Sequence, residues 1–235
     1  MEYIYGKNAI NAYLETNYII EIYATKESIS NDILKKVKSR RINIVEKNKQ
    51  YLDNLVQGAK HQGLVAKIKD FNYSDYNLMV KRALEKQRPI ILMLDGIEDP
   101  HNLGAIIRTC EAFQIDGIII GKHNCCQVNS TVAKVSTGAL AYVDIVQVTN
   151  LTQTLKDLKE KGFWVVAAEA DNSTDYNKMD YNMPTVLIVG SEGYGISRLV
   201  KQQADYNVKI PMTGKVNSLN VSVATAILLS RIVNK

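Results

Sequence analysis

The positions of apolar and polar residues predict two successive series of alternating strands and helices. In the first third of the chain, short apolar runs typical of strands alternate with stretches in which apolar residues recur every three or four positions, as in amphipathic helices. The strands of this series are expected at 18–24, 42–45 and 63–68, and the helices at 7–16, 30–39 and 48–57.

A second series begins at residue 90. Several of its apolar runs, such as 90–95 and 185–190, show no alternation with polar residues. Such runs are typical of strands in a parallel sheet that helices cover on both faces. The other strands are expected at 116–121, 143–148, 163–168 and 207–210, and the helices at 102–113, 130–137, 151–161, 196–203 and 218–232.

A polar segment separates the two series. Residues 70–89 are rich in polar and basic residues and end in a proline, which predicts a partly helical connection. The fold class expected is therefore α/β with two domains. We expect a small domain over 1–75, a linker over 76–89 and a larger domain with a mostly parallel sheet over 90–235.

The composition is that of a globular protein. Apolar residues make up 46% of the 235 residues and charged residues 23%. No stretch approaches the roughly 20 apolar residues that span a bilayer, and the N-terminus lacks the basic and then apolar run of a secretory signal. Cys110, Cys125 and Cys126 form no CxxC pair, so neither a disulfide framework nor a zinc site is expected. These features predict a cytoplasmic protein without a metal centre.

Positive charge is concentrated in the first third. Residues 1–88 contain 16 Lys and Arg against 10 Asp and Glu, whereas residues 89–235 contain 13 against 14. A basic domain beside a near-neutral one is typical of a protein with a polyanionic partner, although a solvated helix face gives the same local pattern. The excess is densest at Lys35, Lys36, Lys38, Arg40, Arg41, Lys47 and Lys49.

The segment 95–113 ends a predicted strand and opens a predicted helix. Asn102 is a candidate N-cap of that helix, because its side chain accepts hydrogen bonds from unpaired N–H groups at a helix start. Arg108 follows six residues later in an otherwise uncharged stretch. Its guanidinium either lies along the surface or binds an anion, and this segment by itself leaves both open.

A second segment, 187–200, contains three glycines around Glu192. Glycines at a strand end give a backbone that can approach a ligand closely. The segment matches neither the Walker A pattern nor the GxGxxG pattern of nucleotide-binding loops. A ligand loop and a tight turn with a surface carboxylate both remain possible interpretations.

A third segment, 208–232, joins a short strand to a long apolar helix. Asn217, Ser218 and Asn220 open that helix, and Asn217 or Ser218 is a candidate cap. The hydroxyl and amide groups exceed what capping needs. Such groups suit an adenosyl moiety or a ribose.

Together, the three segments resemble the signature motifs of the SpoU (TrmH-like) family of RNA ribose 2′-O-methyltransferases. The Asn-x-Gly-x-x-x-Arg pattern lies at 102–108 and the Gly-Ser-Glu-Gly pattern at 190–193. The pattern Ile-Pro-Met followed by Ser-Leu-Asn-Val-Ser lies within 210–222. All three occur in the family's order and at predicted strand-to-helix junctions.

The resemblance extends to the first third. Residues 5–9 and 61–63 are similar to the family's appended RNA-binding domain, a small α/β module similar to a ribosomal protein. With residues 134–140 and 148–151, the two-domain layout resembles the bacterial 23S rRNA guanosine methyltransferase subfamily.

The resemblance implies a fold, a cofactor and partners. The larger domain is expected to be a SPOUT-type α/β domain with a trefoil knot, a topology that general rules would discard. The expected cofactor is S-adenosyl-L-methionine, and the expected partners are RNA, chiefly 23S rRNA, and a second copy of the chain in a homodimer. The positions that match cofactor contacts are Gly190, Ile210, Met212 and Leu219.

Arg108 matches the family's catalytic arginine. A guanidinium is effectively always protonated, so we expect Arg108 to bind the phosphate next to the target ribose and to stabilise the developing alkoxide, rather than to act as a base. The other residues expected at the catalytic site, as groups that orient the ribose or fix its loops, are Asn102, Glu192, Ser218 and Asn220.

Three other functions remain open at this stage. The same reaction on tRNA is one, and a non-catalytic RNA-binding relative is another, although the complete motif set argues against it. A nicotinamide- or flavin-dependent enzyme would need a glycine fingerprint near the first strand, which residues 1–30 lack. The expected chemistry requires the bends at 190–195 and 210–220 to share one pocket with the Arg108 guanidinium, within one chain or across a dimer.

Overall fold

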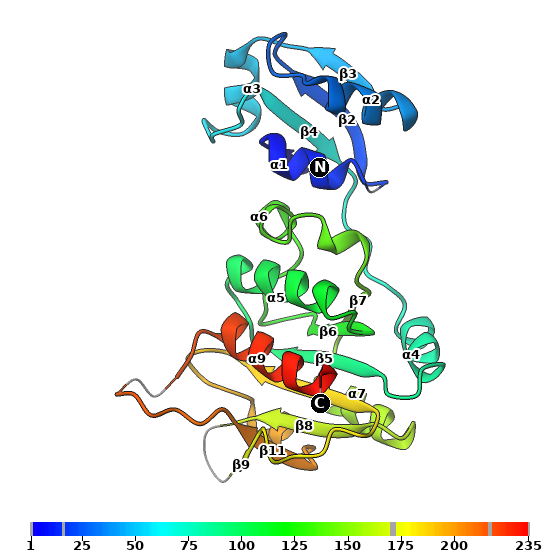
Figure 1. Ribbon diagram of the computed structural model, residues 1–235, viewed down its shortest axis with the longest axis vertical. Helices are drawn as coiled ribbons and strands as arrows, with labels where there is room; N and C mark the ends of the chain where they lie inside the picture. Colours follow the sequence, from blue (N-terminus) through cyan, green and yellow to red (C-terminus); the bar gives the residue numbers. More distant parts are fainter. Residues whose placement is uncertain (1, 16, 170–172, 216–217, 235) are drawn as a thin grey trace. The chain divides into compact units, whose positions relative to one another are not determined.

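The computed structural model describes residues 2–15, 17–169, 173–215 and 218–234, which form two compact units (Figure 1). Unit 1 comprises Met1–Asn72 and Val128–Tyr142, and unit 2 comprises Tyr73–Gln127 and Val143–Lys235. The chain therefore leaves unit 1 after its first third and returns to it once.

A four-stranded mixed sheet forms the centre of unit 1. Its strand order is β1–β4–β2–β3, with β4 antiparallel to β1 and β2, and β3 parallel to β2. Strand β1 was not expected, because its four residues at the chain end give too short a pattern. The bounds are β1 (Glu2–Tyr5), α1 (Lys7–Tyr13), β2 (Ile19–Ala24), α2 (Asn31–Ser39), β3 (Asn43–Glu46), α3 (Lys49–Leu55) and β4 (Leu64–Ile68).

The returning segment of unit 1 was expected in the larger domain. It contains α6 (Ser130–Val135) and the 3₁₀ turn η1 (Ala139–Ala141), and α6 packs against β1. The Lys134 ammonium lies 4.4 Å from the centre of the Tyr5 ring, a cation–π contact. Gly138 has φ +92°, and a Cβ there would lie 3.0 Å from the Ala12 side chain, so glycine permits this close approach.

A seven-stranded sheet forms the centre of unit 2. Every strand pair in it is parallel, which confirms the predicted mostly parallel sheet. The strand order is β7–β6–β5–β10–β8–β11–β9. The bounds are β5 (Ile90–Asp95), β6 (Gly117–Gly121), β7 (Ile145–Val148), β8 (Trp164–Ala168), β9 (Thr174–Asp175), β10 (Thr185–Gly190) and β11 (Tyr206–Lys209).

Helices cover both faces of this sheet. Ile91 and Met93 of β5 belong to one buried cluster with residues of α4 (Tyr76–Leu84), α7 (Leu151–Glu160) and the segment that leads into α8 (Arg198–Lys201). The alternate residues Leu92 and Leu94 are equally buried and point to the opposite face. Two long helices, α5 (Pro100–Ala112) and α9 (Val221–Val233), pack against each other beside the sheet (Figure 1).

Helix α4 lies in the segment expected as a linker. Its Met79, Val80 and Ala83 side chains are buried in the core of unit 2. Burial of apolar side chains stabilises by roughly 1.5–3 kcal/mol for the larger ones, so α4 is part of this unit. No helix in the described part of the chain is long and apolar enough to cross a membrane.

The order of the strands indicates at which edge of the sheet a ligand binds. From β5, the chain adds β6 and β7 on one side and then crosses over to build β8, β10 and β11 on the other. In such parallel sheets, ligands bind outside the carboxyl ends of the strands where the order reverses. That position here is the end of β5 and β10. The trefoil knot that the resemblance implies stays a prediction.

Candidate active site

Helix α5 begins earlier than expected. Asp99 is its N-cap, since the Asp99 side chain accepts a hydrogen bond of 3.0 Å from the His101 N–H, and Pro100 occupies the first turn. Proline suits that position because its φ is preset and it needs no hydrogen-bond acceptor. The prediction that Asn102 caps this helix is therefore wrong. Its side chain is free for another role.

Asn102, Glu192 and Asn220 form a hydrogen-bonded cluster that joins the three sequence motifs. The Asn102 amide donates to Glu192 Oε1 at 3.3 Å. The Asn220 amide donates to Glu192 Oε1 at 2.7 Å and to Asn102 Oδ1 at 2.9 Å. Glu192 Oε1 also accepts from the Val221 N–H at 3.2 Å, at the start of α9. The structure thus brings together three of the five expected catalytic residues.

Capping fixes the direction of these hydrogen bonds. Asn220 is the N-cap of α9, and its Oδ1 accepts from the N–H groups of Ser222 at 3.0 Å and Val223 at 3.4 Å. The Asn220 amide nitrogen must therefore face Glu192 and Asn102. Since Asn102 then accepts through Oδ1, its own amide nitrogen is left to donate to Glu192. Each amide has one consistent orientation.

The glycines of the 190–195 bend have different structural roles. Ser191 and Gly195 exchange backbone hydrogen bonds of 3.1 and 2.9 Å, which folds the bend back on itself. A Cβ at Gly190 would lie 2.1 Å from the Gly195 carbonyl carbon, so only glycine fits there. A Cβ at Gly193 would have no heavy atom within 4 Å outside Gly193 and its two chain neighbours. Gly190 is required by the packing of the bend.

A cleft of about 810 Å³ opens beside the cluster. Its walls are the loops that follow four parallel strands, namely residues 95–99 after β5, 121–125 after β6, 149–152 after β7 and 191–195 after β10. Asn102 and Glu192 line the cleft. It therefore lies at the edge where the strand order predicts ligand binding.

Carboxylates dominate this cleft. The carboxylates that line it are those of Asp95, Glu98, Asp99 and Glu192. Among the described residues, the lining contains one lysine, Lys122. The nearby thiols respond to this environment. Burial, together with Cys125 and the Asp99 charge, raises the pKa of Cys126 to about 11. Burial is also the main cause of the raised pKa of Cys125, to which the Asp95 charge contributes.

Arg108 is not part of the cleft wall within one chain. Its side chain is exposed and makes no hydrogen bond or ion pair with the described residues. It is six helical positions from Asn102, roughly 9 Å along the axis and about 240° around it. The expectation that the guanidinium shares the pocket within one chain is therefore not met. A site across a dimer stays a prediction.

The remaining expected site residues lie outside the hydrogen-bonded cluster. Ser218 is exposed and is not the cap of α9, because Asn220 takes that position. Asn217, the other candidate cap, lies outside the described residues. No hydrogen bond joins Ser218 to the cluster in the part of the chain that the structure describes.

The four residues matched to cofactor contacts are not among the residues that line the cleft. Gly190 and Ile210 are partly buried, whereas Met212 and Leu219 are exposed at 40% and 37%. Gly190 ends β10, and Ile210 directly follows β11 in the same parallel sheet. Exposed apolar side chains beside backbone polar groups are a donor set that fits a neutral adenosine better than a phosphate.

Unit 1 has a cleft of its own, with a volume of about 710 Å³. It is lined by four lysines, two on loops and two at the starts of α1 and α3, together with polar residues such as Asn48 and Gln62. The loops are held by His61, which is buried and hydrogen-bonded to Asp53 and to the Gly63 N–H, both at 3.0 Å. The lysines that line this cleft are Lys7, Lys26, Lys47 and Lys49.

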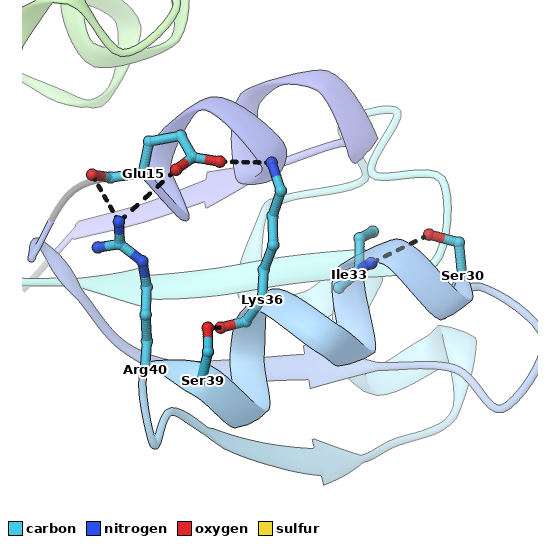
Figure 2. Close-up of polar contacts among 6 residues, drawn as sticks. All are labelled: Glu15, Ser30, Ile33, Lys36, Ser39 and Arg40. Atoms are coloured by element: carbon cyan, nitrogen blue, oxygen red, sulfur yellow. Dashed lines mark hydrogen bonds and ion pairs between the residues drawn. The ribbon is translucent and has the colours of Figure 1, made fainter.

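The densest basic run of the sequence is split by the fold. Lys36 and Arg40 of the α2 region turn toward Glu15, as Figure 2 shows. Arg40 also donates to the Glu15 carbonyl at 2.9 Å. These two charges are locally paired, whereas Lys47 and Lys49 belong to the cleft. The lysine cleft, and not the whole run, is the polyanion-binding candidate of this unit.

Sequence reasoning gave no functional role to the loops 121–125 and 149–152. Their residues follow two of the predicted strands, 116–121 and 143–148. The rule that ligands bind at the carboxyl ends of parallel strands would have identified both loops once the strand order was known. The order of the strands in the sheet cannot be predicted from the local pattern of apolar and polar residues.

Comparison with known proteins covers both units. The model of the SpoU rRNA methylase family matches residues 89–230, and that of the RNA 2′-O ribose methyltransferase substrate-binding family matches residues 3–74. A Staphylococcus haemolyticus relative, named as a TrmH family tRNA/rRNA methyltransferase, is 42% identical over 237 residues. The match covers 99% of this chain and 95% of the relative.

Solved structures share this fold. Two structures of an rRNA methyltransferase from Sinorhizobium meliloti, one with bound AdoMet, have TM-scores of 0.80 and 0.78 at 24% and 26% identity. Each match covers 98% of this chain and 86% of the other. A TrmH/SpoU tRNA modifying enzyme from A. aeolicus is 33% identical with a TM-score of 0.57, over 66% of this chain and 82% of its own. Since the first family model spans more than half of the sequence, this chain belongs to the SpoU rRNA methylase family of RNA methyltransferases.

Proposed function

We propose that this protein transfers the methyl group of S-adenosyl-L-methionine to a ribose 2′-hydroxyl of RNA, with a guanosine of 23S rRNA as the target. The observation that carries the proposal is the Asn102–Glu192–Asn220 cluster. It connects all three motif segments at the edge of a cleft large enough for a second reactant. An RNA substrate of this kind would place the enzyme in the cytoplasm.

The residues matched to cofactor contacts are Gly190, Ile210, Met212 and Leu219, and their apolar and backbone groups suit an adenosyl moiety. When bound, the cofactor supplies a methyl group on a sulfonium. The chain's own task is to hold the ribose hydroxyl in line with that methyl group and to exclude competing water. Glu192, with Oε1 held by three N–H donors, fixes the 190–195 bend against the starts of α5 and α9.

Arg108 is proposed to bind the phosphate beside the target ribose and to stabilise negative charge as the hydroxyl loses its proton. Its exposed position on α5 calls for a neighbour, and we propose a homodimer in which Arg108 completes a site near the interface. Partly exposed apolar residues on and before α9, Val223 and Leu219, support such an interface.

The two-unit layout supports rRNA over tRNA. The match to the Sinorhizobium meliloti rRNA methyltransferase covers 98% of this chain, whereas the match to the A. aeolicus tRNA modifying enzyme covers 66% of this chain. Unit 1 and its lysine cleft would then serve as the rRNA-docking part of the enzyme. A tRNA substrate remains the second candidate, because the curated relatives carry names that include both RNAs.

Two measurements test the proposal. Calorimetric titration with S-adenosylhomocysteine should give one binding event per chain, which a non-catalytic RNA-binding relative would lack. Incubation with radiolabelled S-adenosylmethionine should methylate 23S rRNA from cells that lack this protein, and mapping should locate one new 2′-O-methylguanosine. Methylation of tRNA alone would replace the substrate proposed here.

Mixed dimers test where Arg108 acts. Chains with Arg108→Ala and chains with Asn102→Ala are expected to be inactive by themselves. If Arg108 serves the partner's site, a random mixture of the two should recover about a quarter of wild-type activity, because half of the dimers are hybrids with one intact site of two. No recovery would assign Arg108 to the site of its own chain.

A further inference from the structure

The cleft of unit 2 extends beyond the residues that the proposed function uses. The Asn102–Glu192–Asn220 cluster occupies one side of it. The loops 121–125 and 149–152 form walls that neither the cluster nor the matched cofactor residues use. This inference rests on the proposed function and concerns the part of the RNA that enters those walls.

The loop after β6 is held rigid by its own hydrogen bonds. The Gln127 amide donates to the carbonyl oxygens of Gly121 at 3.3 Å and Cys125 at 3.2 Å. The Cys126 N–H donates to the Ile97 carbonyl at 2.7 Å, which ties this loop to the loop after β5. The Lys122 N–H donates to the Val148 carbonyl at 2.8 Å, at the end of β7. Three walls of the cleft are thus joined through their backbones.

Among the described residues, this bracing leaves two charged side chains of the cleft without partners. Lys122 and Glu98 are exposed, and neither side chain has a hydrogen bond or ion pair with the described residues. Glu98 directly follows Ile97, which accepts the Cys126 N–H, so the two loops that bear Glu98 and Lys122 are in contact. Glu98 and Lys122 thus offer one charged acceptor and one charged donor on connected loops of the cleft wall, and both are available to a ligand.

The charge of the cleft selects what can enter it. Four carboxylates line it against one lysine among the described lining residues, so a phosphate would be repelled. The uncharged parts of RNA are the base and the ribose. A volume of about 810 Å³ is in the range of pockets that bury a small ligand, and enzymes that act on nucleotides read an unstacked base in such pockets.

We propose that this cleft binds the base of the target nucleotide and selects a base with an imino N–H beside a keto oxygen, that is guanine or uracil. The Glu98 carboxylate accepts the imino N–H, and the Lys122 ammonium donates to the keto oxygen. Adenine and cytosine carry an unprotonated ring nitrogen beside an amino group at the same edge. Their lone pair would face the carboxylate, which disfavours them.

Nucleoside binding tests this assignment. The full-length protein is saturated with S-adenosylhomocysteine, and guanosine, uridine, adenosine and cytidine are titrated by saturation-transfer NMR. Guanosine and uridine should bind roughly fivefold or more tightly than adenosine and cytidine. The Glu98→Ala and Lys122→Ala variants should lose that preference. Matched variants at exposed positions outside the cleft, Glu111→Ala and Lys156→Ala, should keep it.

The competing outcomes are distinct. Equal binding of all four nucleosides, or variants that behave like their matched controls, would overturn the base pocket. A Glu98→Ala protein with weakened S-adenosylhomocysteine binding and unchanged nucleoside preference would make the cleft part of the cofactor site instead. If the wild type methylates rRNA but shows no base preference, the proposed function stands and only the base pocket fails. A wild type that binds no S-adenosylhomocysteine would remove both.

Discussion

Unit 1 and unit 2 are both α/β, but they build clefts of opposite charge. The cleft of unit 1 is lined by Lys7, Lys26, Lys47 and Lys49 against two glutamates, whereas the cleft of unit 2 carries four carboxylates and Lys122. Their volumes are similar, about 710 and 810 Å³. The difference separates two tasks. A basic cleft can hold phosphates without reading sequence, and an acidic one admits the uncharged base and ribose.

The sheets differ in a related way. The mixed sheet of unit 1 comprises four strands, whereas all pairs in the seven-stranded sheet of unit 2 are parallel. Parallel strands end at a common edge, so four successive loops converge there on one cleft. This arrangement favours a site that must position several groups at once.

The largest expected effect concerns Arg108. The Arg108→Ala variant should lose methyl transfer by roughly 100-fold or more, because a positioned cation stabilises charge that develops in the transition state. Binding of S-adenosylhomocysteine should stay at the wild-type level in calorimetry. The Arg198→Ala variant removes another exposed arginine of unit 2 and should keep its activity. An Arg108→Ala enzyme with most of its turnover would leave the acidic cleft as the whole active site.

The next effect tests whether the bend at 190–195 is set by packing. Gly190→Ala places a Cβ at 2.1 Å from backbone and should destabilise unit 2 by about 1–3 kcal/mol or more. Gly193→Ala meets no neighbouring atom and should leave the melting temperature unchanged. Differential scanning calorimetry measures both. Equal melting temperatures for the two variants would contradict the close approach of the backbone at Gly190.

A smaller effect is expected at the lysine cleft of unit 1. Lys26→Ala combined with Lys49→Ala should weaken RNA binding and lower the slope of log K against log salt by about 0.7 for each lysine. Lys36→Ala removes a lysine that is already paired with Glu15 and should change the slope less. Filter binding over a series of salt concentrations distinguishes them. A larger change for Lys36→Ala would move the RNA contact to α2.

The smallest expected effect concerns the reactivity of Cys126, whose pKa responds to the negative charge of Asp99 in the cleft. Thiols react as thiolates, so a pKa of about 11 for Cys126 should make its alkylation by iodoacetamide slow at pH 7.5 and faster as the pH rises. Asp99→Asn keeps a capping side chain but removes one charge, and it should speed alkylation by a factor of about two to three. Mass spectrometry of the Cys126 peptide gives the rate. An unchanged rate would mean that burial and Cys125 set this pKa without Asp99.

The local sequence pattern was enough to predict the central strands of unit 2, but it did not predict the short strands or the returning segment of unit 1. The continuous apolar runs of β5 and β10 end at Asp95 and Gly190, where the structure also ends them. Strands β1 and β9 contain four and two residues, too few for a period to show. The return of Val128–Tyr142 to unit 1 depends on packing between segments far apart in sequence, and no local signal marks it.

The motif resemblance pointed to three residues that the structure joins by hydrogen bonds, but the sequence could not assign their geometry. Asn102 bonds to residues 90 and 118 positions away. Both helix starts contain several side chains able to cap. The sequence pattern indicated Asn102 for the first helix and Asn217 or Ser218 for the second, whereas Asp99 and Asn220 are the caps. The choice is settled by tertiary contacts: Asp99 caps α5 and leaves Asn102 for the cluster, whereas Asn220 both caps α9 and belongs to the cluster.

The Asn102–Glu192–Asn220 cluster also has a consequence for biosynthesis. Two of the three donors to Glu192 Oε1 come from Asn220 and Val221, which follow all the strands of both sheets in the sequence. A ribosome therefore has to translate past all of these strands before the carboxylate acquires its full set of donors. Products that stop short of residue 220 would keep all the strands of both sheets and lack the assembled centre.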